Sequence, residues 1–175
     1  MKFSYVYVII IVFIVVFIAN RAFSTIVARK RAVIRKYIEL ESACRGRTEN
    51  VVSLLKSVKN ELKETEPQYE TTLTALKATL ETSKVLEQSK LETELCNCLE
   101  KLTEVIRKYD SLREKEEVRK FHKLLAASDA EIAYKAREYN EVVELYNQSL
   151  GKGLGAFVAK NLFRFDREDK FNYKK

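Results

Sequence analysis

Turn-forming residues are nearly absent from this chain. Its 175 residues include four glycines and one proline, and there is no tryptophan. Domains rich in strands need frequent turns, which glycine and proline largely supply. Because charged residues also make up 33% of the chain, the composition argues against a sheet and predicts an all-α fold of long helices.

Residues that serve catalysis and metal binding are also scarce. His122 is the only histidine, and there are three cysteines, Cys44, Cys96 and Cys98. An odd number without a typical spacing argues against a disulfide-stapled secreted domain. Cys96 and Cys98 would point about 200° apart on a helix, so they cannot share a zinc ion from that element, and we expect Cys98 to pack between helices.

A nucleotide-binding glycine loop is not expected either. Gly151, Gly153 and Gly155 follow a helical pattern, whereas a nucleotide fingerprint follows a strand. The sequence therefore predicts a protein that is not an enzyme, with no catalytic residue, no metal, no cofactor and no small-molecule substrate.

The longest apolar run of the chain lies at its start. Residues 3–19 are apolar except for Ser4, which is enough to cross a bilayer as a helix. A cleavable signal peptide is the alternative, but the nearest cleavage pattern, residues 20–22, places Arg21 just before the cut. We expect a retained anchor, with residues 1–28 as the transmembrane segment and its basic flank.

Positive charge is concentrated after this run. Lys2 precedes the apolar run, and no acidic residue occurs between the run and Glu39. The flank consists of Arg21, Arg29, Lys30, Arg31, Arg35 and Lys36. The positive-inside rule then predicts a single-pass protein of the inner membrane, with its N-terminus outside and residues 21–175 in the cytoplasm. The flank would also suit anionic lipid headgroups.

The net charge of +7 does not indicate a nucleic-acid partner. Residues 152–175 carry seven basic and three acidic side chains, and residues 37–151 are acidic overall. A nucleic-acid-binding domain carries its positive charge on the folded face. We therefore expect no nucleic acid among the partners.

Apolar residues in heptad spacing predict a first long helix after the anchor. Its seam consists of Val33, Tyr37, Leu40, Cys44, Val51, Leu54, Val58 and Leu62. The heptad spacing places one further seam position between Cys44 and Val51, and Arg47 occupies it. There Arg47 would pair with a polar group of another helix or with an acidic neighbour. Pro67 ends the helix, because the residue before a proline is pushed out of the helical region.

Two further helices follow in the sequence pattern. The second runs from Tyr69 to Tyr109, with a phase slip in the polar residues 81–90 that would bend or loosen it. The third runs from Val118 to Leu150 and ends at the glycines. The prediction is a long antiparallel bundle over residues 29–150, with three long helices that continue the transmembrane helix. Residues 151–175 would form a glycine turn, a short apolar C-terminal helix and a basic, aromatic tail.

A polar stripe borders the seam of the third helix. Its polar residues lie next to Tyr139, Val143 and Tyr146 of the seam, and two Tyr-Asn pairs occur one heptad apart. The candidate structural or interaction stripe therefore consists of Arg137, Tyr139, Asn140, Val143, Tyr146 and Asn147. One interpretation is an interhelical hydrogen-bond ladder that fixes register, and the other is a patch for a partner. The tail, with Phe163, Phe165 and Phe171, would either cap the open end of the bundle or lie in a membrane interface.

These residues resemble the LemA family. Ile132-Ala133, Arg137 and the two Tyr-Asn pairs are similar to its C-terminal signature, and Phe163, Phe165 and Phe171 to the aromatic residues that follow it. The resemblance implies a bacterial single-pass membrane protein with a helical bundle and no established enzymatic activity. Departures include Asp110 at the corner where the family has a proline.

Together these patterns predict a membrane-anchored, non-enzymatic helical scaffold or interaction protein of the LemA type. The alternative is a lipid-binding or membrane-remodelling protein that uses the basic flank and the aromatic tail. The expected partners are the lipid bilayer and either further copies of the chain or other membrane proteins.

Overall fold

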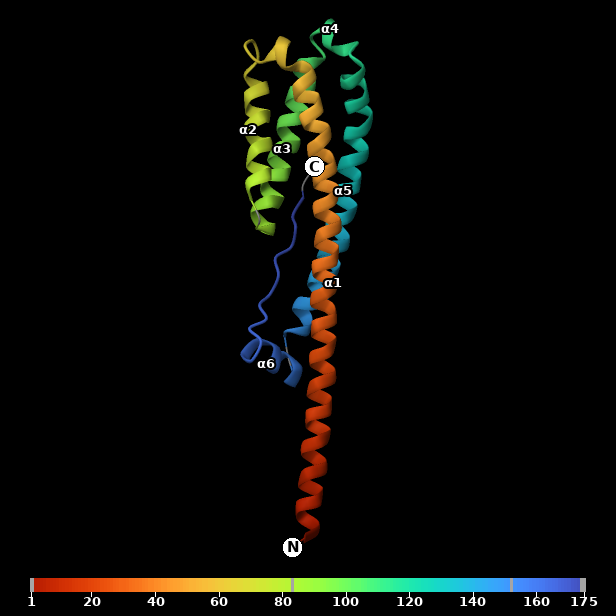
Figure 1. Cartoon of the computed structure of the whole chain (residues 1–175), viewed down its shortest axis with the longest axis vertical. Helices are drawn as coiled ribbons and strands as arrows, with labels where there is room; N and C mark the ends of the chain where they lie inside the picture. Colours follow the sequence, from red (N-terminus) through yellow and green to blue (C-terminus); the bar gives the residue numbers. More distant parts are fainter. Residues whose placement is uncertain (1, 83, 152, 174–175) are drawn as a thin grey trace. The chain divides into compact units, whose positions relative to one another are not determined.

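The fold is entirely helical in the residues that the structure, a computed structural model, describes: 2–82, 84–151 and 153–173. Six helices and no strand occur there (Figure 1). They are α1 (Lys2–Leu62), α2 (Pro67–Glu81), α3 (Val85–Ile106), α4 (Asp110–Arg113), α5 (Glu116–Ser149) and α6 (Leu154–Asn161). The predicted all-α fold is confirmed.

Helix α1 contains the apolar run and continues into the bundle. By length and composition, its part from Tyr7 to Leu62 could cross a membrane, and its most apolar 18-residue window has a mean hydropathy of 2.3. The helix ends at Leu62, whose carbonyl accepts a hydrogen bond from the Glu66 N–H at 2.9 Å. Pro67 then opens α2 in the first helical turn, where its missing N–H costs nothing.

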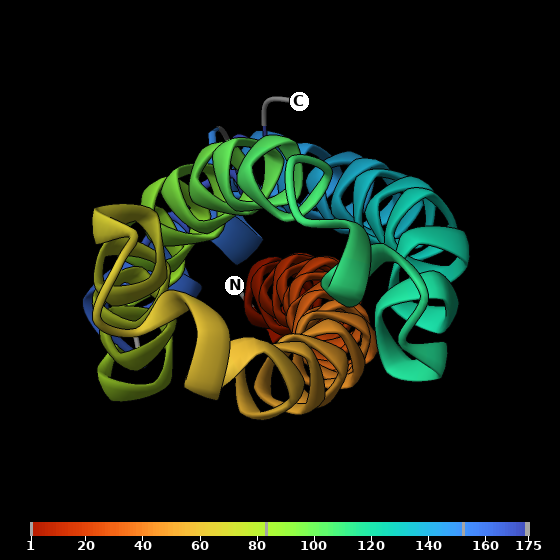
Figure 2. The same cartoon turned by 90° about the horizontal axis from the view of Figure 1, so that it is seen from above.

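The predicted second helix is two helices. The chain reverses after Glu81, and α2 and α3 pack side by side as an antiparallel hairpin (Figures 1 and 2). Thr82 and Lys84 have extended backbones, and the break falls at the phase slip in the apolar stripe. A continuous helix would have turned one half of this stripe away from the core, so a reversal buries both halves better.

Two compact units make up the chain. One contains Met1–Tyr37 and Tyr139–Asp169, and the other contains Ile38–Glu138 and Lys170–Lys175. The core of the second unit draws apolar side chains from α1 to α5, among them Leu54, Leu99, Leu112 and Phe121. An amphipathic helix gains most of its stability from packing its apolar face against other helices. The shared core therefore holds these helices together as one unit.

Apart from the half-buried Tyr37, the predicted seam of α1 is buried, and so is the seam of α5 from Ile132 to Leu150. Val51, Val58, Ile132 and Val143 are fully enclosed. Leu80 of α2 continues the heptad spacing of Leu73 and Leu76 in the sequence, which predicts a buried position, but its side chain is 63% exposed. Cys98 is half-buried, and Cys96 takes the buried position instead.

Candidate functional site

The tail after α6 has no regular structure, and side chains of α5 hold it in an extended conformation. The Tyr139 hydroxyl donates to the Asp169 carbonyl, and the Tyr146 hydroxyl donates to the Asp166 carbonyl, each at 3.0 Å. Between these two bonds, Asn147 pairs with both backbone groups of Glu168. Its Nδ2 donates to the carbonyl at 2.8 Å, and its Oδ1 accepts from the N–H at 3.0 Å.

We call Tyr139, Tyr146 and Asn147 the tail clamp. The spacing of Tyr139 and Tyr146 by one heptad places both on the same side of α5, where both side chains are buried. All four hydrogen bonds of the clamp reach backbone atoms of the tail. The clamp therefore supplies hydrogen-bond partners to peptide groups of a segment that belongs to no helix or strand.

Burial determines the acid–base state of the clamp. It raises the pKa of Tyr146 to about 12, with smaller contributions from the nearby carboxylates of Glu168 and Asp166. The pKa of Tyr139 is raised as well, chiefly by burial and then by Glu168. Both phenols therefore remain neutral donors at physiological pH.

Two residues of the basic flank contact the clamp region. Lys30 forms an ion pair with Glu168, and its ammonium lies 5.4 Å from the ring centre of Tyr146. Arg29 donates to the Leu145 carbonyl at 2.9 Å. Lys36 is half-buried, and the remaining flank residues, Arg21, Arg31 and Arg35, are exposed.

Helix α6 packs closely on α1. A Cβ on Gly155 would lie 2.6 Å from the Cβ of Ala22, so only glycine allows this approach. The Phe23 and Phe163 rings stack with their centres 4.6 Å apart. Gly153 precedes the helix with a φ of +98°, a conformation that favours glycine. The glycines thus shape this turn, and the helix packs just after the apolar run of α1.

A buried group of charges forms a second candidate site, around Arg47 of α1. Its Nη1 donates to Asp129 Oδ1 of α5 at 3.0 Å and to the Tyr173 hydroxyl of the tail at 2.8 Å. Its Nη2 forms an ion pair with Glu92 of α3. Tyr173 in turn donates to Asp129 at 3.0 Å. We call these four residues the Arg47 cluster.

Burial perturbs the groups of this cluster and its neighbours. The side chains of Arg47, Glu92 and Asp129 are 1%, 2% and 2% exposed. Burial raises the pKa of Glu92, and the opposing effect of the Arg47 charge does not cancel it. Burial, and then the negative charge of Glu92, raise the pKa of the Cys44 thiol as well. A raised pKa makes a thiol unreactive, which favours a structural role.

The other predicted site residues are distributed over both units. Arg137 is exposed, with its guanidinium 5.6 Å from the ring centre of Tyr134. Asn140 is half-buried and Val143 is buried. Of the tail aromatics, Phe163 is exposed, Phe165 half-buried and Phe171 buried. Three of the seven basic residues counted after the glycine turn, Lys152, Lys174 and Lys175, lie outside the described residues.

Sequence reasoning missed Glu92, Asp129 and Tyr173 as partners of Arg47. A signal was present in the spacing. Glu92 lies three residues before Leu95, and Asp129 lies three residues before Ile132, so both occupy apolar seam positions. Charged residues of opposite sign in the seams of three helices indicate a buried network, because none of them would be stable there unpaired.

Comparison with known proteins supports the resemblance noted in the sequence. The model of the LemA family matches residues 36–175. No curated protein matches the chain. The matched region begins at the end of the basic flank and includes the Arg47 cluster and the tail clamp. It covers most of the chain, which therefore belongs to the LemA family.

Proposed function

We propose that this chain is a single-pass protein of the bacterial inner membrane whose helical bundle acts as a non-enzymatic interaction scaffold. The observation that carries the proposal is the exposure of the apolar start of α1. Ile9, Phe13 and Phe17 are 64%, 76% and 62% exposed, whereas the seam positions further along the helix are buried. Apolar surface on this scale around a whole helix is stable in lipid and unstable in water.

The basic flank supports an orientation with the bundle in the cytoplasm. Arg21, Arg31 and Arg35 are exposed, so their charges are available to anionic headgroups of the inner leaflet. Each such residue contributes about 1 kcal/mol near a negatively charged surface. The bundle would then present its outer faces to other membrane proteins or to further copies of the chain.

Cysteine labelling in intact and permeabilised bacterial cells tests this orientation. The native thiols are poor probes, because Cys44 and Cys96 are buried. We would introduce the exposed probe Ser111→Cys in a Cys98→Ser background, which removes the half-buried native thiol. A membrane-impermeant reagent should label the probe only after permeabilisation. Labelling of intact cells would overturn the orientation.

A second function, binding to the bilayer surface, is favoured by the surface of α6 and of the two residues that follow it. Leu154, Phe157, Leu162 and Phe163 are between 51% and 69% exposed. This helix packs on α1 at Ala22 and Phe23, directly after the apolar run. If the run spans the membrane, these side chains lie at the depth of the headgroups, where exposed aromatic and aliphatic residues insert favourably.

Spin labels on the full chain in lipid nanodiscs test this second function. A label at Phe157→Cys should be relaxed by oxygen, which concentrates in lipid. A label at the matched control Asn60→Cys, also exposed on a helix, should be relaxed by a water-soluble nickel complex. The same nickel accessibility at both positions would show that α6 faces water.

A further inference from the structure

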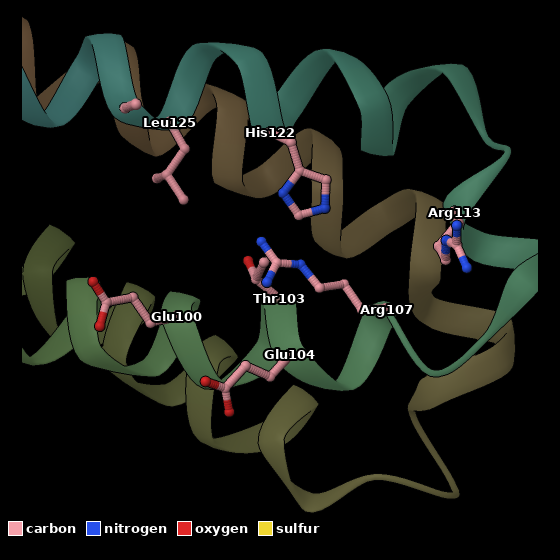
Figure 3. Close-up of a pocket in the computed structure, with 8 residues that line it drawn as sticks. Glu100, Thr103, Glu104, Arg107, Arg113, His122 and Leu125 are labelled. Atoms are coloured by element: carbon pink, nitrogen blue, oxygen red, sulfur yellow. The ribbon is translucent and has the colours of Figure 1, made fainter.

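A pocket of about 540 Å³, with charged and polar side chains in its lining, lies within the second unit, between α3, α4 and α5. Figure 3 shows its lining side chains. Helix α3 contributes Thr103 and the residue that caps its C-terminus, Arg107, and α5 contributes His122. Neither the anchor nor the tail takes part in this pocket, so its role is separate from theirs.

Two side chains that can carry positive charge face each other across the pocket. The Arg107 guanidinium is turned toward the His122 imidazole (Figure 3). Within the described part of the chain, no hydrogen bond or ion pair of the guanidinium is present. Burial, and then the charge of Arg107, lower the pKa of His122. An anion between the two groups would remove this repulsion.

The Thr103 hydroxyl is a third group that lacks a partner. Thr103 is 7% exposed, and its Oγ1 has no hydrogen-bond partner among the described residues. A buried hydroxyl without a partner destabilises a fold, because it has given up its hydrogen bonds to water. Thr103 lies one helical turn before Arg107 and lines the same pocket. Its hydroxyl is thus placed to donate to a ligand that also contacts Arg107.

The remaining charges limit what such a ligand can be. Arg113 forms an ion pair with Asp110 at 3.1 Å, and its side chain is largely exposed. Glu100 and Glu104 line the pocket on the side of α3, and they would repel a second negative group. We propose that Thr103, Arg107 and His122 bind the single anionic group, a phosphate or carboxylate, of a small molecule whose other end is neutral or positively charged.

The single histidine makes the proposal directly measurable. Proton NMR of the full chain in uncharged detergent would follow the imidazole signal of His122 through a pH titration, with sulfate as the probe. Sulfate stays doubly charged between pH 5 and 8, so any linkage to pH comes from the protein. We expect saturable binding that raises the pKa of His122 and is tighter at pH 5.5 than at pH 8. An equal effect of chloride at the same ionic strength would overturn the proposal.

Substitutions then separate binding from folding. Arg107→Gln should raise the pKa of His122 without sulfate and weaken sulfate binding by about 10- to 100-fold, as expected for a charged hydrogen bond. The matched control Arg119→Gln removes the same charge from an exposed position outside the pocket and should change neither value. Unchanged binding by Arg107→Gln would contradict the site.

Thr103→Val provides a variant that should fold at least as well as the native chain. It replaces a buried hydroxyl that lacks a partner with a methyl group, so the unfolding midpoint should stay or rise. Sulfate binding should nevertheless weaken by about 3- to 10-fold. If the variant unfolds more easily and binds sulfate as before, the hydroxyl is structural and the proposal fails.

A free metabolite and a lipid headgroup share the same anionic chemistry, and two samples distinguish them. The first is the chain in uncharged detergent with phosphoethanolamine, which carries a phosphate and an amine. The second is the chain in nanodiscs that contain phosphatidylethanolamine. A response of His122 to the soluble compound supports a free ligand, and a response only in the nanodiscs supports the lipid. If His122 responds neither to sulfate, nor to phosphoethanolamine, nor in the nanodiscs, the proposed site is overturned.

Discussion

The tail clamp and the Arg47 cluster both hold the C-terminal tail, but with opposite chemistry. The clamp uses neutral side chains that bind backbone atoms of residues 166–169. The cluster binds a single side chain, Tyr173, with an arginine and a carboxylate that are almost fully buried. Neutral hydrogen bonds contribute modestly and tolerate changes in the tail sequence, whereas a buried charge network is costly when incomplete.

This difference assigns distinct roles to the two regions. The clamp would bind any extended segment of suitable length, because its four hydrogen bonds reach backbone atoms, which every residue of such a segment offers. The cluster requires a hydroxyl at the position of Tyr173 and charges on three helices. It therefore fixes which parts of α1, α3 and α5 face one another, as buried polar groups do in coiled coils.

The largest effect is expected for Arg47→Ala. It leaves two carboxylates buried without their cation, which should lower the free energy of unfolding by about 3 to 5 kcal/mol. Chemical denaturation of the full chain in detergent, followed by circular dichroism, measures this. The control Arg45→Ala lies two residues away, where the side chain is 70% exposed, and should change stability by less than about 0.5 kcal/mol.

Replacing the three charged residues of the cluster should sharpen this result. The triple variant Arg47→Met, Glu92→Leu and Asp129→Leu removes every buried charge at once. It should recover most of the stability lost by Arg47→Ala, since apolar replacements of buried ion pairs are often neutral or stabilising. Recovery with a changed oligomeric state would support a role in register. A triple variant as unstable as Arg47→Ala would show that packing, and not charge, dominates there.

A smaller loss is expected when the clamp is weakened. Asn147→Ala removes two hydrogen bonds to the tail and should lower the free energy of unfolding by about 1 to 3 kcal/mol. Limited proteolysis should also cut the tail more readily. The exposed neighbour Gln148→Ala is the matched control and should leave cleavage unchanged. Equal protection of the tail in both variants would show that the hydrogen bonds of Asn147 do not hold the tail in place.

High pH should loosen the clamp. The folded chain holds the protons of Tyr139 and Tyr146 more tightly than the unfolded chain, whose tyrosines titrate near pH 10. Their contribution to stability is therefore complete below about pH 10 and is lost as the pH rises toward 12. Alkaline denaturation should be shallower in the variant with both Tyr139→Phe and Tyr146→Phe. An unchanged pH profile would show that neither phenol is protected in the folded state.

The smallest effect is expected at Gly46, within α1. A Cβ there would meet no atom within 4 Å, so alanine fits and favours the helix. Gly46→Ala should raise the free energy of unfolding by roughly 0.5 to 1 kcal/mol. A loss of stability would reveal a close neighbour, such as a second copy of the chain. Gly155→Ala is the contrasting variant and should destabilise the packing of α6 on α1.

Sequence periodicity predicted the helices well and their partners poorly. The seams of α1 and α5 follow directly from heptad spacing, because burial of a stripe is the main force on an amphipathic helix. The reversal between α2 and α3 was expected only as a bend, since spacing does not tell a bent helix from a hairpin. Likewise, Asn147 was predicted in a stripe, but its bonds to Glu168 depend on the path of an irregular tail, which has no periodic pattern.

The two hydrogen bonds between Asn147 and the Glu168 backbone depend on the number of residues in the tail and not on which side chains those residues carry. Substitutions at residues 166–169 leave the peptide groups in place, with proline at position 168 as the exception because it lacks the N–H. Inserting or deleting one residue between Asp166 and Asp169 would instead shift the backbone groups along the clamp by about 3.3 Å, so the carbonyls that bind Tyr146 and Tyr139 could not both stay in place. The tail should therefore tolerate varied residues at a fixed length.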